Sequence, residues 1–192
     1  MKPNANKQNG KSKVKTYVIM MSKQFTKGHP KEGAPTEFAD KILLGQNLSK
    51  DKCVLCRALR GDLWPKIHTI RENYDYWAPR IKEVQEGRAV LSIREWTGKP
   101  YNSSPITICT LTAENGVGIQ KVVFDESGRH TIREMVDNRA PHYRIDDESV
   151  GSLDVAYIAH NDGLSFFDFA NWFAKHDVRK PLAIIHFTKF RY

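Results

Sequence analysis

Residues 64–73 read WPKIHTIREN, and our interpretation of the fold starts from this stretch. In a β-strand, alternate side chains point to opposite faces, so Thr69 and Arg71 share a face. Lys66 falls on the other face unless the chain turns beside it, and Pro65 favours such a turn because its ring fixes φ. The stretch either presents three polar groups at the start of a strand or forms an ordinary edge strand.

The composition indicates a soluble protein of one domain. The chain has 192 residues, of which 40% are hydrophobic and 27% charged, so it can bury a normal core. The sequence contains no run of about eighteen apolar residues that would predict a membrane span. Residues 1–15 lack the apolar segment of a secretory signal. We expect a cytoplasmic protein without a membrane partner.

Positive charge gathers at the N-terminus. Residues 1–15 carry five lysines and no acidic residue, so five of the net +8 charges belong to this segment. Such an arm either binds nucleic-acid phosphates, with release of a counterion for each lysine, or is a solvated tail without a role. We expect residues 1–15 to form a disordered basic tail, followed by a single domain over residues 16–192.

Three cysteines argue against a disulfide framework in a chain without a secretory signal. Cys53 and Cys56 have CxxC spacing, but no second Cys or His pair follows at the distance that zinc sites need. The sequence therefore predicts no metal site. We interpret the two thiols as small apolar side chains on a helix beside Leu55 and Leu59.

The order of strand and helix patterns does not fit repeated βαβ units. Strand-like runs cover residues 13–21, 66–71, 88–96, 105–112, 117–124, 152–159 and 181–190. Helical patterns cover residues 37–45, 49–61 and 77–86. We expect a hairpin turn at AENG (113–116) and a charged excursion outside the core over residues 125–150. About six strands with two to four helices indicate an α+β fold, a mixed and partly closed sheet with helices at its ends.

The last predicted helix has the clearest start signal. Ser165 and Asp168 have the spacing of a capping box, and Leu164 and Phe169 have that of a hydrophobic staple. Apolar residues then follow at i, i+3, i+4 and i+7 from Phe166, which makes one helix face apolar. We predict a helix that begins after Ser165.

The segments FADKILLG (38–45) and KIHTIR (66–71) together resemble the ASCH family, a branch of the PUA-like superfamily of small β-barrels. In that family a helix ending in Gly leads into a Lys-x-x-Thr-x-Arg strand, here Lys66, Thr69 and Arg71. The later NDGLSFFDFANWF (161–173) and LAIIHFTKF (182–190) also look like elements of the family. The resemblance implies a PUA-like mixed, partly closed β-barrel, with insertions at about 46–65 and 113–150.

One function that the resemblance implies is enzymatic. Some ASCH proteins resemble small amidohydrolases that remove an acyl group from N4-acylated cytidine, and their Lys, Thr and Glu correspond here to Lys66, Thr69 and Asp162. A Thr hydroxyl needs a neighbouring base, and a Lys can act as that base only if burial or a cation such as Arg71 lowers its pKa. Asp162 would then pass a proton to the leaving amine. Such a metal-independent site needs no cofactor.

Each of these residues also has an ordinary interpretation. Lys66 is then an exposed lysine after a turn, and Thr69 a residue that suits any strand. Arg71 would form a structural salt bridge, and Asp162 would start a turn before the helix.

We favour a binding module for RNA or a modified nucleobase or nucleoside, with the amidohydrolase as the alternative. Aromatic side chains would stack on the base, each base contributing roughly 1–3 kcal/mol. In both cases the Lys66 amine and the Asp162 carboxylate should lie within about 8 Å of each other. The residues that we expect to bind the ligand are Arg71, Trp64, Tyr74, Trp77, Lys99 and Tyr101.

Overall fold

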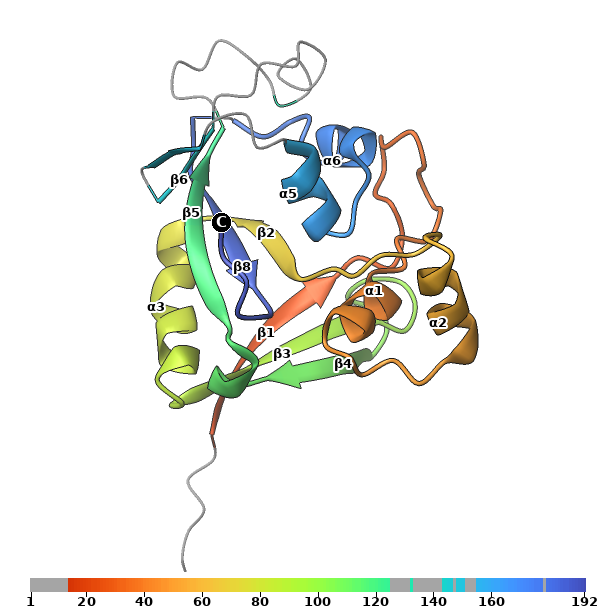
Figure 1. Ribbon diagram of the computed structural model, residues 1–192, viewed down its shortest axis with the longest axis horizontal. Coiled ribbons are helices and arrows are strands. Elements are labelled where there is room, and N and C mark those ends of the chain that lie inside the picture. The colour runs from red at the N-terminus through yellow and green to blue at the C-terminus, as the bar shows by residue number, and fades with distance from the viewer. Residues whose placement is uncertain (1–13, 125–131, 133–142, 147, 151–154, 178) are drawn as a thin grey trace, which may run out of the picture.

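Two separate β-sheets form the framework of the chain (Figure 1). The computed structural model describes residues 14–124, 132, 143–146, 148–150, 155–177 and 179–192. In the first sheet, β1 runs parallel to β3, and β3 and β4 form an antiparallel hairpin. The strands of this sheet are β1 Lys15–Met21, β3 Ala89–Trp96 and β4 Pro105–Leu111.

The second sheet has the strand order β2-β8-β5-β6-β7 and is antiparallel throughout. In β2, Thr69 pairs with Ile185 of β8, and Thr69 and Arg71 share one face as the alternation predicts. The strands of this sheet are β2 His68–Glu72, β5 Gly118–Val123, β6 Tyr143–Ile145, β7 Glu148–Val150 and β8 Leu182–His186.

The free edge of β2 is covered by the end of a helix and not by another strand. The Ile67 N–H donates to the Asn161 carbonyl at 3.0 Å, and the Ile70 N–H donates to Asp162 Oδ1 at 3.1 Å. The Ile70 N–H is a donor that a further strand would need, whereas Ile67 lies just before β2. The chain is α+β as expected, but the predicted partly closed PUA-like barrel is wrong, because the described strands remain in two open sheets.

The hairpin predicted at AENG is also wrong. Ala113–Asn115 form a 3-10 turn, η1, and Gly116 follows with φ +77°. Since β4 belongs to the first sheet and β5 to the second, this turn carries the chain from one sheet to the other. Gly116 suits the position because a left-handed φ carries a steric cost for residues with a Cβ.

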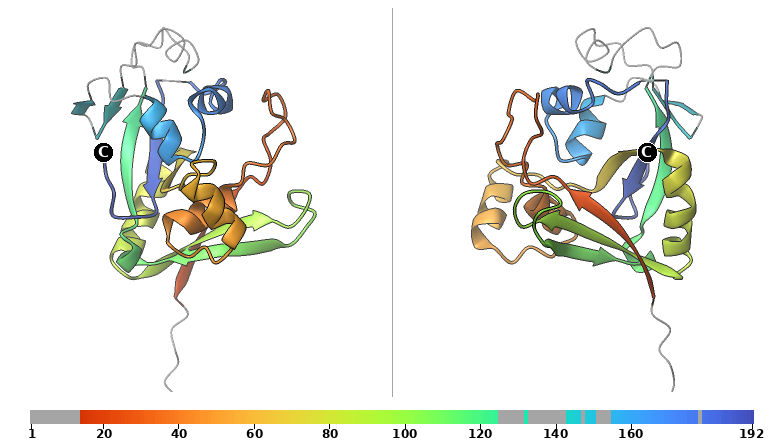
Figure 2. Two further views of the ribbon diagram at one scale, coloured as in Figure 1. Left: turned by 45° about the vertical axis from the view of Figure 1, so that its right-hand side comes forward. Right: turned by 180° about the vertical axis from the view of Figure 1, so that it is seen from behind.

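The helices gather at two sides of the sheets. Helix α3 lies on the side of the molecule opposite to α1 and α2, and α5 and α6 lie beside each other (Figures 1 and 2). No described helix is long and apolar enough to cross a membrane. The five labelled helices of the described residues are α1 Phe38–Gly45, α2 Lys52–Leu59, α3 Tyr74–Gln85, α5 Val155–Asn161 and α6 Phe166–Trp172.

The helix predicted after Ser165 is confirmed as α6. The Ser165 hydroxyl accepts a hydrogen bond from the Asp168 N–H at 3.1 Å, and its own O–H donates to the Asp168 carboxylate at 2.7 Å. Leu164 and Phe169, the two residues of the predicted staple, are both buried. Local side-chain contacts therefore define where this helix starts.

The strand predicted at 152–159 is wrong, because residues from Val155 onwards form α5. The buried residues Val155, Ile158 and Ala159 follow i, i+3, i+4 spacing, which suits a helix. A short apolar run does not distinguish the two periodicities, and the packing of α5 against α6 selects the helix.

Part of the predicted excursion belongs to the core. Ile132, Tyr143 and Ile145 are 1–3% exposed, and Tyr143 packs its ring against Phe124. The expectation that residues 125–150 lie outside the core is therefore wrong for these three side chains. Most of 125–150, and residues 1–13 of the predicted tail, lie outside the described residues, and β1 begins at Lys15.

Candidate functional site

Lys66 and Asp162 form a buried ion pair. Lys66 lies two residues before β2, and Asp162 directly follows α5. The Lys66 ammonium is 2.7 Å from Asp162 Oδ1 and also donates to the Asp162 carbonyl. The two side chains are only 1% and 6% exposed. The prediction that these two groups lie within about 8 Å is confirmed.

Two glycines let the backbone approach Lys66. A Cβ on Gly45, the last residue of α1, would lie 2.8 Å from the Lys66 carbonyl oxygen. Gly163 has φ +76°, and a Cβ there would lie 3.1 Å from Lys66 Cβ. The Gly that ends the helix in FADKILLG therefore has a packing reason, because α1 passes directly over the start of the strand.

A second buried lysine, Lys41 of α1, lies beside the pair. Its ammonium donates to the Gly163 carbonyl at 2.8 Å and lies 4.6 Å from the centre of the Trp64 ring. The Lys66 ammonium similarly lies 4.5 Å from the centre of the Phe38 ring. Two ammonium groups thus bind successive carbonyls just after α5, where the helix dipole favours positive charge.

Burial sets the direction of the pKa shifts in this cluster. Desolvation lowers the pKa of Lys66 to about 8, against the opposing attraction of Asp162. Desolvation also raises the pKa of Asp162 and lowers that of Lys41. With a pKa of about 8, Lys66 is mainly protonated at pH 7 and donates to both oxygens of Asp162 that it contacts.

Thr69 and Arg71 have different surroundings although they share a strand face. Arg71 donates to the Met20 carbonyl at 2.8 Å and so connects β2 to the end of β1. Thr69 is 3% exposed, and within the described part of the chain its hydroxyl makes no hydrogen bond. Arg71 lines an open groove, whereas Thr69 does not.

The Arg71 groove lies between β2, the first turn of α3 and the end of α6. It has a volume of about 490 Å³. Two indole rings, one phenyl ring and three basic side chains contribute to its wall, a combination that suits a flat polar ligand. The residues that line it are Ile70, Arg71, Glu72, Trp77, Trp172, Phe173, Lys175 and His176.

The buried ion pair lies directly behind this groove. Ile70 lines the groove, and its backbone N–H donates to the Asp162 carboxylate. Trp172 also lines the groove and packs edge-on against Phe38, with ring centres 5.8 Å apart. Phe38 in turn contacts the Lys66 ammonium. The pair therefore supports two elements of the groove wall without being exposed in it.

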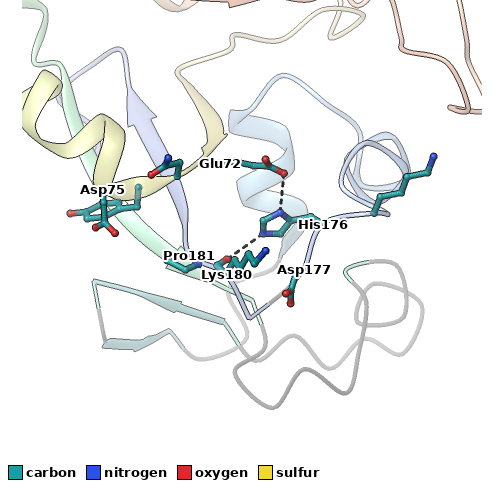
Figure 3. A pocket seen from close by; sticks show the side chains of 9 residues that line it. Glu72, Asp75, His176, Asp177, Lys180 and Pro181 are labelled. Atoms are coloured by element: carbon teal, nitrogen blue, oxygen red, sulfur yellow. Dashed lines mark hydrogen bonds and ion pairs between the residues drawn. The ribbon is translucent and has the colours of Figure 1, made fainter.

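A second pocket, the His176 pocket, adjoins the groove and shares Glu72, Lys175 and His176 with it (Figure 3). The His176 ring lies between the Glu72 carboxylate, 3.3 Å from Nδ1, and the Lys180 carbonyl, 3.2 Å from Nε2. The pocket has a volume of about 460 Å³ and mixes carboxylates with lysines, so it favours neither sign of charge. Tyr74 lines this pocket and not the Arg71 groove.

The other expected ligand-binding residues lie elsewhere. Trp64 stacks on His160 and lines a third cavity of about 180 Å³, together with Lys41. Lys99 and Tyr101 belong to the connection between β3 and β4, and they line none of the three cavities. Tyr101 is 89% exposed. The structure thus brings Arg71 and Trp77 together and separates them from Trp64, Tyr74, Lys99 and Tyr101.

Three residues that matter to the site were not predicted from the sequence. Trp172 ends α6 and Phe173 directly follows it, and the sequence pattern predicts Phe173 on the apolar face of the helix. Lys41 had a detectable signal, because it lies one turn after Phe38 and beside Ile42 on the otherwise apolar face of α1.

Two histidines lie on the opposite face of β2 from Arg71. His68 and the cross-strand His186 of β8 are both fully buried, and their rings are 5.7 Å apart. Within the described part of the chain, His68 Nε2 and both ring nitrogens of His186 lack a hydrogen-bond partner. Burial lowers the pKa of His186 to about 3, so this ring is neutral at pH 7. Among the described residues, no three His, Cys, Asp or Glu side chains could together hold a metal ion.

A scan against family models finds no match to the chain, and searches of curated proteins and of solved structures find none either. The resemblance to the ASCH family therefore depends on the quoted motifs alone.

Proposed function

We propose that the chain binds a nucleobase or nucleoside, free or as part of RNA, in the Arg71 groove. The observation that supports this most strongly is the wall of the groove, which Trp77, Trp172 and Phe173 line together with the cationic Arg71 and Lys175. A planar base stacks on aromatic rings, and its carbonyl and phosphate oxygens accept hydrogen bonds from cations. The resemblance to the ASCH family implies the same class of ligand.

The size of the groove agrees with this ligand. Small-molecule pockets usually measure about 300–1,000 Å³, and 490 Å³ falls within that range. The cavity beside Lys41, at about 180 Å³, is smaller than that range. The Arg71 groove is also built on β2, α3 and α6, whose positions are fixed by the core, which reduces the ordering cost of binding.

Calorimetry with cytidine, N4-acetylcytidine and a short single-stranded RNA tests the proposal. Replacing Trp172 by Leu should weaken binding about fivefold to 150-fold, the equivalent of 1–3 kcal/mol of lost stacking. Lys175→Gln changes an exposed cation of the groove and should weaken binding of the phosphate-containing RNA more than of the nucleosides.

Two matched variants serve as controls for this experiment. Trp96→Leu and Lys52→Gln alter the same residue types outside the groove, and they should bind like the wild type. Equal effects of Trp172→Leu and Trp96→Leu would contradict the assignment of the groove.

A second candidate function is the hydrolysis of N4-acylated cytidine. The 2.7 Å contact between Lys66 and Asp162, with Thr69 on the adjoining strand, favours it, as does the lowered pKa of Lys66. Against it, the Lys66 ammonium is 1% exposed and already donates to two oxygens, so a substrate has no direct access to it. The arrangement suits a supporting role for the pair better than proton transfer.

Chromatography of N4-acetylcytidine after incubation with the protein separates the two functions. We expect binding without release of cytidine. Thr69→Val, which removes only a hydroxyl, should then leave binding intact. Release of cytidine by the wild type, abolished by Thr69→Val, would establish the amidohydrolase instead.

A further inference from the structure

The CxxC pair of α2 is exposed to solvent. Cys53 and Cys56 are both free and exposed, and Val54 is the one buried residue of this helix. Leu55 and Leu59 beside them are 40% and 89% exposed. The helix predicted for the two thiols is confirmed as α2, but the thiols do not pack as apolar side chains, because α2 presents this face to solvent.

The geometry of the helix brings the two cysteines within reach of each other. Residues i and i+3 lie on one helix face, and helical rise and radius place their Cα atoms about 5.1 Å apart. Disulfides usually span Cα separations of about 4.4–6.8 Å. Their Cβ atoms, about 5–6 Å apart in a regular helix, must approach to about 3.5–4.5 Å, so the bond requires a local adjustment.

The start of α2 can make that adjustment. Cys53 is the second residue of the helix, and its N–H donates to the Asp51 side chain at 2.7 Å and not to a carbonyl of the helix. Moving Cys53 therefore mainly disturbs the Asp51 cap, while the later helical hydrogen bonds persist. The end of α2 is held separately by the ion pair of Arg57 and Glu37.

We propose that Cys53 and Cys56 form a redox-active dithiol that is reversibly oxidised by low-molecular-weight disulfides such as glutathione disulfide. One cysteine thiolate attacks the disulfide, forms a mixed disulfide and releases one glutathione thiolate. The second cysteine thiolate then attacks the protein sulfur of that mixed disulfide and releases the second glutathione. The protein loses two protons and two electrons, and glutathione disulfide is reduced to two thiols.

The bond so formed is readily reversed. Exposed or strained disulfides are the ones that thiols reduce easily, and this bond is both. Cys109 of β4 provides an internal reference, because it is 8% exposed and burial raises the pKa of its thiol to about 11. Cys109 should remain reduced under conditions that oxidise the dithiol.

Mass spectrometry after exposure to glutathione disulfide and alkylation tests the proposal. The folded wild type should lose the mass of two hydrogens. Cys53 and Cys56 should no longer be alkylated, whereas Cys109 should still be alkylated. Excess reduced glutathione should restore the alkylation of Cys53 and Cys56. Cys56→Ser should accumulate the mixed disulfide at Cys53. Circular dichroism verifies that each variant is folded, which is expected since the changed side chains are exposed.

A spacing control makes the test specific. Cys56→Ala combined with Leu55→Cys keeps two exposed thiols but places them at i and i+2, which point away from each other on a helix. This variant should accumulate mixed disulfides and form no internal bond. Stable glutathione adducts on the wild type, or equal cyclisation of the spacing control, would overturn the proposal.

Discussion

Lys66→Met tests how the buried ion pair behaves. The substitution keeps most of the side-chain stem but removes the ammonium from the Asp162 carboxylate, which is 6% exposed. Among the described residues, the Ile70 N–H is then the one close donor to this carboxylate. Removing one partner of a buried ion pair costs about 3–5 kcal/mol, because the remaining charge stays buried without compensation. We expect a loss of unfolding free energy of this size at pH 8.

The loss should depend on pH in a defined direction. Burial raises the pKa of Asp162, and the effect should be larger when the Lys66 cation is absent. A carboxyl whose folded pKa is raised stabilises the fold below the unfolded value of about 3.9, and this contribution is lost as the pH rises through the folded pKa. The free energy of unfolding of Lys66→Met should therefore be closest to that of the wild type near pH 4, and the difference should grow towards pH 8.

A double-mutant cycle completes this test. Asp162→Asn removes the charge but keeps an oxygen that can accept from the Ile70 N–H, so Lys66→Met with Asp162→Asn should be more stable than Lys66→Met alone at pH 8. Urea unfolding followed by circular dichroism at pH 4 and pH 8 gives the free energies. A single variant within about 1 kcal/mol of the wild type at both pH values, or additive effects of the two substitutions, would refute the reasoning.

Three further predictions concern the fold and the limits of the site. Because burial lowers the pKa of His186, the wild type should lose stability as the pH falls from about 6.5 towards 3. In thermal melts, His186→Leu should reduce the change of unfolding free energy with pH by about 1.4 kcal/mol per pH unit, and an unchanged pH dependence would contradict this. Gly45→Ala should lower the free energy of unfolding by about 1–3 kcal/mol, since the added Cβ would lie 2.8 Å from the Lys66 carbonyl oxygen. In the same urea titration, Gly98→Ala should be near neutral, because its Cβ contacts would be 3.6 Å or more. Tyr101→Ser should leave nucleoside affinity unchanged by calorimetry, because Tyr101 does not line the groove, and a weaker affinity would return the β3–β4 connection to the site.

Local signals in the sequence were sufficient for some elements of the fold. Helix α6 begins where Ser165 and Asp168 predict, because both partners of the cap lie within one turn of each other. The strand pairings have no such local signal. β2 pairs with β8 from the far end of the chain, and nothing in residues 66–71 specifies whether a helix or a strand covers the other edge. The barrel was therefore predicted wrongly although most of its strands exist.

The candidate site was likewise predicted only in part from the sequence. The resemblance to the ASCH family implied that Lys66 and Asp162 lie together, and the structure contains this contact. Gly45 and Gly163 permit the close approach of the backbone to Lys66. The groove was only partly predicted. Phe173 follows the apolar pattern of a core helix, and only the position of the end of α6 beside β2 brings its ring into the groove wall.

The most direct test of nucleoside binding in the Arg71 groove uses the four indole N–H signals in a two-dimensional NMR spectrum of the protein. Two of the four tryptophans, Trp77 and Trp172, line the groove, while Trp64 and Trp96 lie outside it. Titration with cytidine or N4-acetylcytidine should shift the signals of Trp77 and Trp172 along one binding curve and leave the other two in place. A shift confined to Trp64 or Trp96, or no shift at millimolar nucleoside, would contradict the proposal.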